Sequence, residues 1–307
     1  MPRWFAYCLL AMLFWGGWAV IPNALKMHRK EMPISSFQQM AFSTIGFVPV
    51  MAVVFAWGRR RDAEPKPGGV LCAFVAGIIG GFGNIAYYAA AGAVGSKASV
   101  VAPLTALYPL LTVLLAMLFL GERPNRVQAA GIAIAAGSLY AFNPLGKEAD
   151  LEALRSGSSA LLPILFWGVT ALLQKISADW ISSRLATLWF LAASIPMAVF
   201  IVCTQPMQWE LKPLEWLWVL LLGVLLGLGN FFFIAANANE GKASVVTPLS
   251  GLYSIVTLPL AYYFFDERLG KREWLGVAAA LAAVVALSWE RKPPVETAKP
   301  GMNGGNG

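Results

Sequence analysis

Ten long apolar blocks constrain the fold of this chain more than any other feature. A bilayer core needs about 20 apolar residues per helical span, and every block is close to that length. The blocks are rich in Ala, Leu, Val and Gly and lack the two-residue alternation of barrel strands. Helices are the remaining way to satisfy the backbone inside lipid. The blocks cover roughly residues 4–25, 35–57, 69–92, 99–120, 125–143, 158–177, 184–204, 214–237, 244–265 and 272–289.

The sequence therefore predicts an all-α integral membrane protein with ten transmembrane helices. Only 13% of the residues are charged, whereas soluble domains carry about a quarter. The net charge of +7 is spread over short loops, so no nucleic-acid partner is expected. The first block is too long and too weakly flanked for a cleaved signal peptide. The arginines at 59–61 and the basic tail favour cytoplasmic N- and C-termini.

One stretch occurs twice. KASVVAPLTALY at 97–108 and KASVVTPLSGLY at 242–253 are identical at nine of twelve positions. LFWG at 13–16 recurs at 165–168, and the glycines before Asn84 match those before Asn230. The repeat predicts equivalent helices in the two halves, with Ser99 and Ser244 as N-caps and with bends at Pro103 and Pro248.

This repeat divides the chain into two halves of five spans. We expect a first repeat at 1–143, a linker at 144–157, a second repeat at 158–290 and a disordered tail at 291–307. Because five is odd, the second half must enter the membrane in the opposite sense. Inverted repeats are typical of secondary transporters, with the substrate site near the midplane between the repeats.

The motifs also carry a family resemblance. GERPNRVQAAG at 121–131 resembles the turn between the last two helices of an EamA domain, and DERLGKREWLG at 266–276 is the second copy, with Asp266 in place of Gly. Two such domains in tandem resemble the ten-helix members of the drug/metabolite transporter superfamily. The resemblance implies a multi-pass carrier in a bacterial inner membrane, with both termini cytoplasmic and a central cavity. It leaves the substrate open.

Matched aromatic and amide residues are the candidate substrate-binding groups. Tryptophans prefer membrane interfaces, and buried amides need polar partners, so matched examples near mid-span indicate a cavity wall. Helix-packing bulk and interhelical hydrogen bonds are the structural alternatives. The candidates are Trp15, Asn84, Tyr88, Tyr108, Trp167, Asn230, Asn237 and Tyr253.

The spans hold almost no ionisable groups. All acidic residues lie in loops or at span ends, the single histidine is His28, and no CxxC pair is present. We therefore expect no catalytic residues, metal or cofactor. A lining without carboxylates suits a small neutral, zwitterionic or mildly anionic metabolite, with an amino acid as the first candidate. A channel-like pore and a polytopic membrane enzyme are the alternatives. The expected partners are the substrate and the lipid bilayer, and the protein is expected to be a monomer or weak homodimer. Whether Lys175 faces the cavity is left open.

Overall fold

A computed structural model describes residues 2–29, 32–57, 66–93, 96–121, 124–142, 151–239, 241–268 and 270–287. Within these ranges the chain is helical and contains no strand. The arginines at 59–61, the Glu-Arg pair at 122–123, residues 144–150 of the expected linker and the tail at 291–307 lie outside the described residues. The helices are α1 (Arg3–His28), α2 (Ser36–Trp57), α3 (Pro67–Gly92), α4 (Ala98–Thr105), α5 (Tyr108–Phe119), α6 (Arg126–Phe142), α7 (Leu151–Trp180), α8 (Ser183–Ala192), α9 (Ser194–Thr204), α10 (Pro213–Ala238), α11 (Ala243–Gly251), α12 (Ser254–Phe265) and α13 (Lys271–Leu287).

Seven helical segments of the described chain are long and apolar enough to cross a membrane. Three of them are formed by two consecutive helices: α4 with α5, α8 with α9, and α11 with α12. Helices α6 and α13 have 17 residues each and follow the apolar blocks expected at 125–143 and 272–289. Large apolar side chains on the outside of the bundle, including Leu118, Phe119 and Tyr263, form the surface that lipid would contact.

Two of the interruptions follow the prolines of the repeated stretch. Helix α4 ends two residues after Pro103, and α11 ends three residues after Pro248. A proline inside a helix removes one backbone hydrogen bond and clashes with the preceding turn. Equivalent sequences are thus interrupted at equivalent places, just before Tyr108 and at Tyr253.

The start of α4 differs from the sequence prediction. The N-cap is Lys97, not Ser99, and Lys242 rather than Ser244 caps α11. The carboxylate of Glu267 takes the role expected of the serine: it accepts hydrogen bonds from the backbone N–H groups of Ala98 (3.2 Å) and Ser99 (2.9 Å). A carboxylate at a helix N-terminus satisfies free donors and interacts favourably with the helix dipole. A residue of the second half therefore holds the start of a first-half helix.

The turns after α5 and α12 share one backbone conformation. Gly121 has φ of 64°, and Asp266, the residue that replaces glycine in the second copy, has φ of 50°. Glycine adopts this left-handed region freely, and aspartate is among the few other residues that tolerate it. The substitution noticed in the sequence thus preserves the geometry of the turn.

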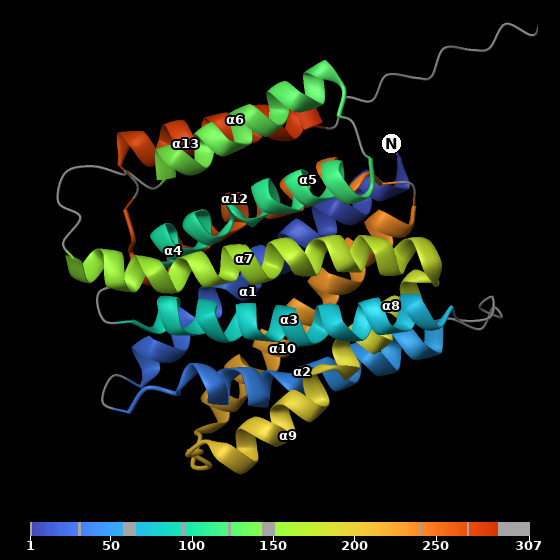
Figure 1. Cartoon of the computed structure of the whole chain (residues 1–307). Coiled ribbons are helices and arrows are strands. Elements are labelled where there is room, and N and C mark those ends of the chain that lie inside the picture. Colours follow the sequence, from blue (N-terminus) through green and yellow to red (C-terminus); the bar gives the residue numbers. More distant parts are fainter. Residues whose placement is uncertain are drawn as a thin grey trace, which may run out of the picture.

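The centre of the bundle holds two long helices from each half: α1 and α3 from the first, and α7 and α10 from the second (Figure 1). Helix α3 packs along α7, and α1 packs along α10. Helices α6 and α13 lie side by side at one edge of the bundle (Figure 1). Because each of these contacts joins a first-half helix to a second-half helix, the space at the centre lies between the halves.

Candidate functional site

A small cavity lies between the central helices. Its volume is about 50 Å³. Six of the eight residues predicted from the sequence line it: Trp15, Asn84, Tyr108, Trp167, Asn230 and Tyr253. The lining residues that were not predicted are Trp18, Gly80, Thr170, Ala171, Gln174, Phe190 and Leu226. None of these described residues carries a formal charge, so the wall is aromatic, aliphatic and amide.

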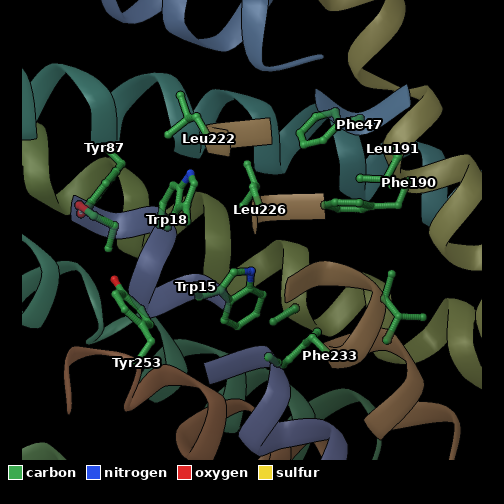
Figure 2. Packing of buried hydrophobic residues seen from close by; sticks show 14 of the residues in the cluster. Trp15, Trp18, Phe47, Tyr87, Phe190, Leu191, Leu222, Leu226, Phe233 and Tyr253 are labelled. Atoms are coloured by element: carbon green, nitrogen blue, oxygen red, sulfur yellow. Dashed lines mark hydrogen bonds between the residues drawn. The ribbon is translucent and has the colours of Figure 1, made fainter. Parts of the chain in front are cut away.

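The two tryptophans occupy equivalent places in opposite halves. Trp15 of α1 packs against Gly229 of α10, and Trp167 of α7 packs against Gly83 of α3. A Cβ atom on either glycine would overlap the indole ring, so the missing side chain makes room for the tryptophan. Figure 2 shows Trp15 between Leu226 and Phe233, whose ring centroid lies 5.2 Å from that of Trp15.

The glycines that follow these tryptophans, Gly16 and Gly168, accept equivalent hydrogen bonds through their backbone carbonyls. The hydroxyl of Thr257 donates to the carbonyl of Gly16 at 3.2 Å, and that of Thr112 donates to the carbonyl of Gly168 at 3.0 Å. Thr112 and Thr257 occupy matched positions of the repeat. These bonds anchor each tryptophan-bearing helix to a helix of the opposite half.

The two asparagines have different partners. Asn84 accepts a hydrogen bond from the indole Nε1 of Trp167 at 3.1 Å. Asn230 instead accepts from Nε2 of Gln174 at 3.0 Å and donates to the carbonyl of Leu226 at 2.9 Å. Both amides are buried and both lie at the cavity, but only the first half's asparagine is bonded to a tryptophan.

The two tyrosines also differ. The hydroxyl of Tyr253 lies 3.1 Å from that of Thr105 and donates to the carbonyl of Ala102 at 3.1 Å. The hydroxyl of Tyr108 has no hydrogen-bond partner among the described residues. Its ring packs edge-on against Trp167, with centroids 5.9 Å apart. Tyr108 and Tyr253 therefore share a place in the wall but not a bonding state.

Tyr88 and Asn237 are not brought to the cavity. Tyr88 lies one helical turn beyond Asn84, where its hydroxyl accepts a hydrogen bond from the indole Nε1 of Trp18 at 3.1 Å. Trp18 thus occupies the cavity wall in its place. Asn237 lies two turns beyond Asn230, near the end of α10, and its amide donates to the carbonyl of Phe233 at 3.0 Å. Sharing a helix face was not sufficient, because each residue lies too far along its helix.

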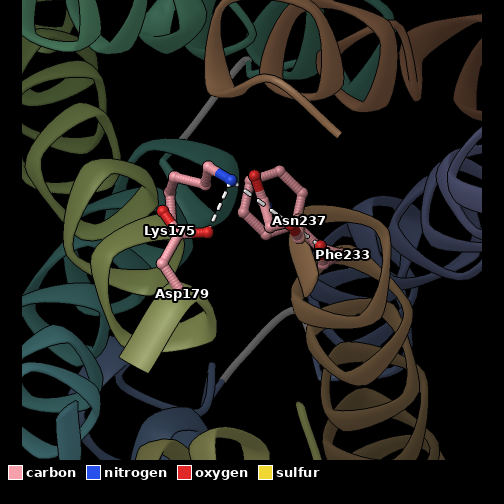
Figure 3. Close-up of polar contacts among 4 residues, drawn as sticks. All are labelled: Lys175, Asp179, Phe233 and Asn237. Atoms are coloured by element: carbon pink, nitrogen blue, oxygen red, sulfur yellow. Dashed lines mark hydrogen bonds and ion pairs between the residues drawn. The ribbon is translucent and has the colours of Figure 1, made fainter. Parts of the chain in front are cut away.

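Lys175 does not line the cavity. Its ammonium group lies 2.7 Å from Oδ1 of Asp179 and 3.4 Å from the backbone carbonyl of Asn237 (Figure 3). The side chain is mostly buried between α7 and α10. At the other end of the core, Lys26 of α1 donates to the carbonyl of Ala93 at 2.7 Å and to Ser96, just after α3. Each half thus has one lysine that ties its first long helix to the end of its third.

The sequence belongs to a known family on the strength of two matched segments. The model of the EamA-like transporter family matches residues 2–143 and again residues 156–289. The chain belongs to the EamA-like transporter family. Together with the apolar helices, this membership makes it a multi-pass membrane transporter.

Two known proteins are similar to this chain. A Sinorhizobium sp. protein named "Uncharacterized transporter in cobO 3'region" is 31% identical over 134 residues, which is 42% of this chain and 93% of that protein. A solved protein crystal structure superposes with a TM-score of 0.69 at 18% identity, covering 93% of this chain and 96% of the other. At that identity the structural likeness shows the fold alone.

Within this EamA-like transporter, the aromatic and amide residues Trp18 and Gln174 were missed because neither has an identical counterpart in the other half. Trp18 is matched by Thr170 in the second half, and Gln174 is matched by Pro22 in the first. A search for identical residues at matched positions cannot find them. A helical-spacing argument from Trp15 would have found Trp18, three positions later on the same face, and from Trp167 would have found Gln174, two turns later.

Proposed function

We propose that this protein is a secondary transporter of a small metabolite that works by alternating access between two inverted five-helix halves. In this proposal ten helices cross a bacterial inner membrane, and both termini are cytoplasmic. The observation that carries the proposal is a cavity at the junction of the halves, walled by matched Trp, Asn and Tyr residues from each. A site near the midplane between repeats is the arrangement expected of such carriers.

The small volume of the cavity supports a mechanism in which the lining helices move apart. A volume of about 50 Å³ accommodates a few water molecules, whereas metabolite pockets are typically about 300–1,000 Å³. A metabolite therefore requires the lining helices to part. The lysines at opposite ends of the core, Lys26 and Lys175, tie helices together on either side of the cavity. If the contacts of Lys26 and those of Lys175 broke alternately, the cavity would open on one side at a time.

The lining supports a neutral, zwitterionic or mildly anionic cargo, with an amino acid as the first candidate. No carboxylate is available at the described wall to balance a bound cation. Amides and indole and phenol groups offer hydrogen bonds, and the rings of Trp18, Trp167 and Phe190 offer apolar contact. Such a mixture of an apolar wall and a few polar groups is typical of small-molecule sites.

Flux measurements in proteoliposomes test the proposal. The purified protein is reconstituted and assayed for counterflow with a broad panel of labelled metabolites, amino acids among them. We expect saturable flux of one chemical class, reduced at least about tenfold by Trp15→Ala and by Asn84→Ala. Trp189→Ala, at an exposed position of α8, is the matched control and should retain flux. Absence of flux across the panel, or single-channel currents in a planar bilayer, would overturn the proposal.

A further inference from the structure

The matched tryptophans and tyrosines of the cavity wall differ in hydrogen bonding between the two halves. In the second half, Trp167 and Tyr253 both have hydrogen-bond partners. In the first half, the indole N–H of Trp15 and the hydroxyl of Tyr108 have none among the described residues. Their side chains are nevertheless only 9% and 4% exposed. A buried donor without a partner destabilises the folded state and calls for an explanation.

Gln174 explains the unbonded state of Trp15. Trp15 lies beside Gly229 and Asn230 just as Trp167 lies beside Gly83 and Asn84. By analogy with the Trp167–Asn84 bond, the acceptor for Trp15 is the side-chain oxygen of Asn230. That oxygen instead accepts from Nε2 of Gln174, and the nitrogen of the same amide donates to the carbonyl of Leu226, so these two bonds fix the Asn230 amide in an orientation in which it does not bond to Trp15. The equivalent residue in the first half is Pro22, which has no side-chain donor, so nothing competes with Trp167 for Asn84.

We propose that Trp15 and Tyr108 form a pair of donors reserved for a hydrogen-bond acceptor on the cargo, and that Gln174 keeps Trp15 free by holding Asn230. This inference rests on the proposed transport function and names the chemistry that the site recognises. Two unpaired donors in a wall without carboxylates select a carboxylate or carbonyl oxygen. The rest of the molecule packs against Trp18, Trp167 and Phe190, which line the same cavity.

Three ring compounds separate this chemistry from its rivals. Benzoate presents a carboxylate, benzamide a neutral carbonyl, and benzylamine a cation without an acceptor oxygen. Aromatic walls attract cations by themselves, so benzylamine measures what the rings contribute without the donor pair. Binding is measured by calorimetry on the full-length protein in lipid nanodiscs, and thermal unfolding confirms that each variant is folded.

We expect benzoate or benzamide to bind wild type more tightly than benzylamine. Trp15→Phe removes the indole N–H donor. Gln174→Leu frees Asn230 to accept a hydrogen bond from that N–H, which is then no longer available to the ligand. Each change should therefore weaken binding of the preferred acceptor probe about tenfold. The double variant should bind the probe no more weakly than Trp15→Phe alone, because both changes remove the same hydrogen bond between Trp15 and the ligand. Trp189→Phe is the matched control, with affinity equal to that of wild type.

A measurement without any ligand accompanies these. In protein labelled with ¹⁵N at the indole nitrogens, Gln174→Leu should move the Trp15 N–H proton resonance downfield, as a new bond to Asn230 forms. An unmoved resonance would overturn the proposal, as would benzylamine binding best, or equal affinity of Trp15→Phe and wild type for both acceptor probes. Failure of the transport proposal looks different: binding would follow the expected pattern, but proteoliposomes would show no flux.

Discussion

The first and second halves of this transporter build the same wall and bond it differently. Trp15 and Trp167 each fill the space above a glycine of the opposite half, and Tyr108 and Tyr253 begin or precede equivalent helices. Yet the second half's tryptophan and tyrosine are hydrogen-bonded, whereas those of the first half have no hydrogen-bond partner among the described residues. Identical side chains therefore set the shape of the cavity, while their unmatched neighbours set its chemistry.

The difference arises from neighbours in both halves. Gln174, at the position where the first half has Pro22, bonds to the Asn230 amide, which we propose would otherwise accept from Trp15. Thr105 presents a hydroxyl to Tyr253, whereas its counterpart Ser250 makes no such bond to Tyr108. In our proposal, this difference lets the first half hold the polar end of a cargo while the two halves keep equivalent backbones.

The largest effect is expected where the halves are most alike, at the glycines of close helix contacts. A Cβ at Gly223 would overlap the backbone carbonyl of Ser43, and one at Gly77 would overlap that of Phe190. Because a backbone cannot turn aside as a side chain can, Gly223→Ala and Gly77→Ala should each destabilise the protein by about 1–3 kcal/mol or more. Thermal unfolding in detergent measures this.

The control for these substitutions is Gly137→Ala in α6. A Cβ there would meet nothing within 4 Å, so the change should be neutral or stabilising by up to about 1 kcal/mol, from helix propensity. If Gly77→Ala destabilised the protein while Gly223→Ala did not, the two helix contacts would not be equivalent. That result would contradict the claim that the two halves share one backbone arrangement.

A smaller effect should separate the two tyrosines. Tyr253→Phe removes the bonds to Thr105 and Ala102 and should destabilise the protein by about 1 kcal/mol. Tyr108→Phe removes a buried hydroxyl that has no partner among the described residues, so it should leave stability unchanged or raise it slightly. Unfolding midpoints measured side by side test this, and equal losses for both variants would contradict the difference in bonding.

The sequence predicted the cavity wall only where a residue has an identical twin. Trp15, Asn84 and Tyr108 were found with their counterparts because identity at matched positions marks shared geometry. Gln174 was not predicted, because its counterpart Pro22 is not an identical residue and gave no signal. The hydrogen bond between Gln174 and Asn230 could not be predicted either. Hydrogen bonds between α7 and α10 depend on helix rotation and depth, which the pattern of apolar residues does not fix.

Local backbone geometry was predicted unevenly as well. The sequence predicted bends at Pro103 and Pro248, and the structure has helix interruptions close to both. The cap of α4 could not be predicted locally, since it comes from Glu267, 169 residues away from Ala98. Serine is a frequent N-cap, but Ser99 lies inside α4, and a contact from the opposite half supplies the acceptor that a capping serine would provide.

The opposite orientation of the two halves is most directly tested at the twin lysines. Lys97 and Lys242 are exposed N-caps of equivalent helices, and our account places Lys97 outside and Lys242 in the cytoplasm. Lys97→Cys and Lys242→Cys, each in a background without Cys8, Cys72 and Cys203, are treated with a membrane-impermeant maleimide on intact cells and after permeabilisation. The account predicts that Lys97→Cys reacts in intact cells and that Lys242→Cys reacts only after permeabilisation. Labelling of both positions from the same side would contradict it.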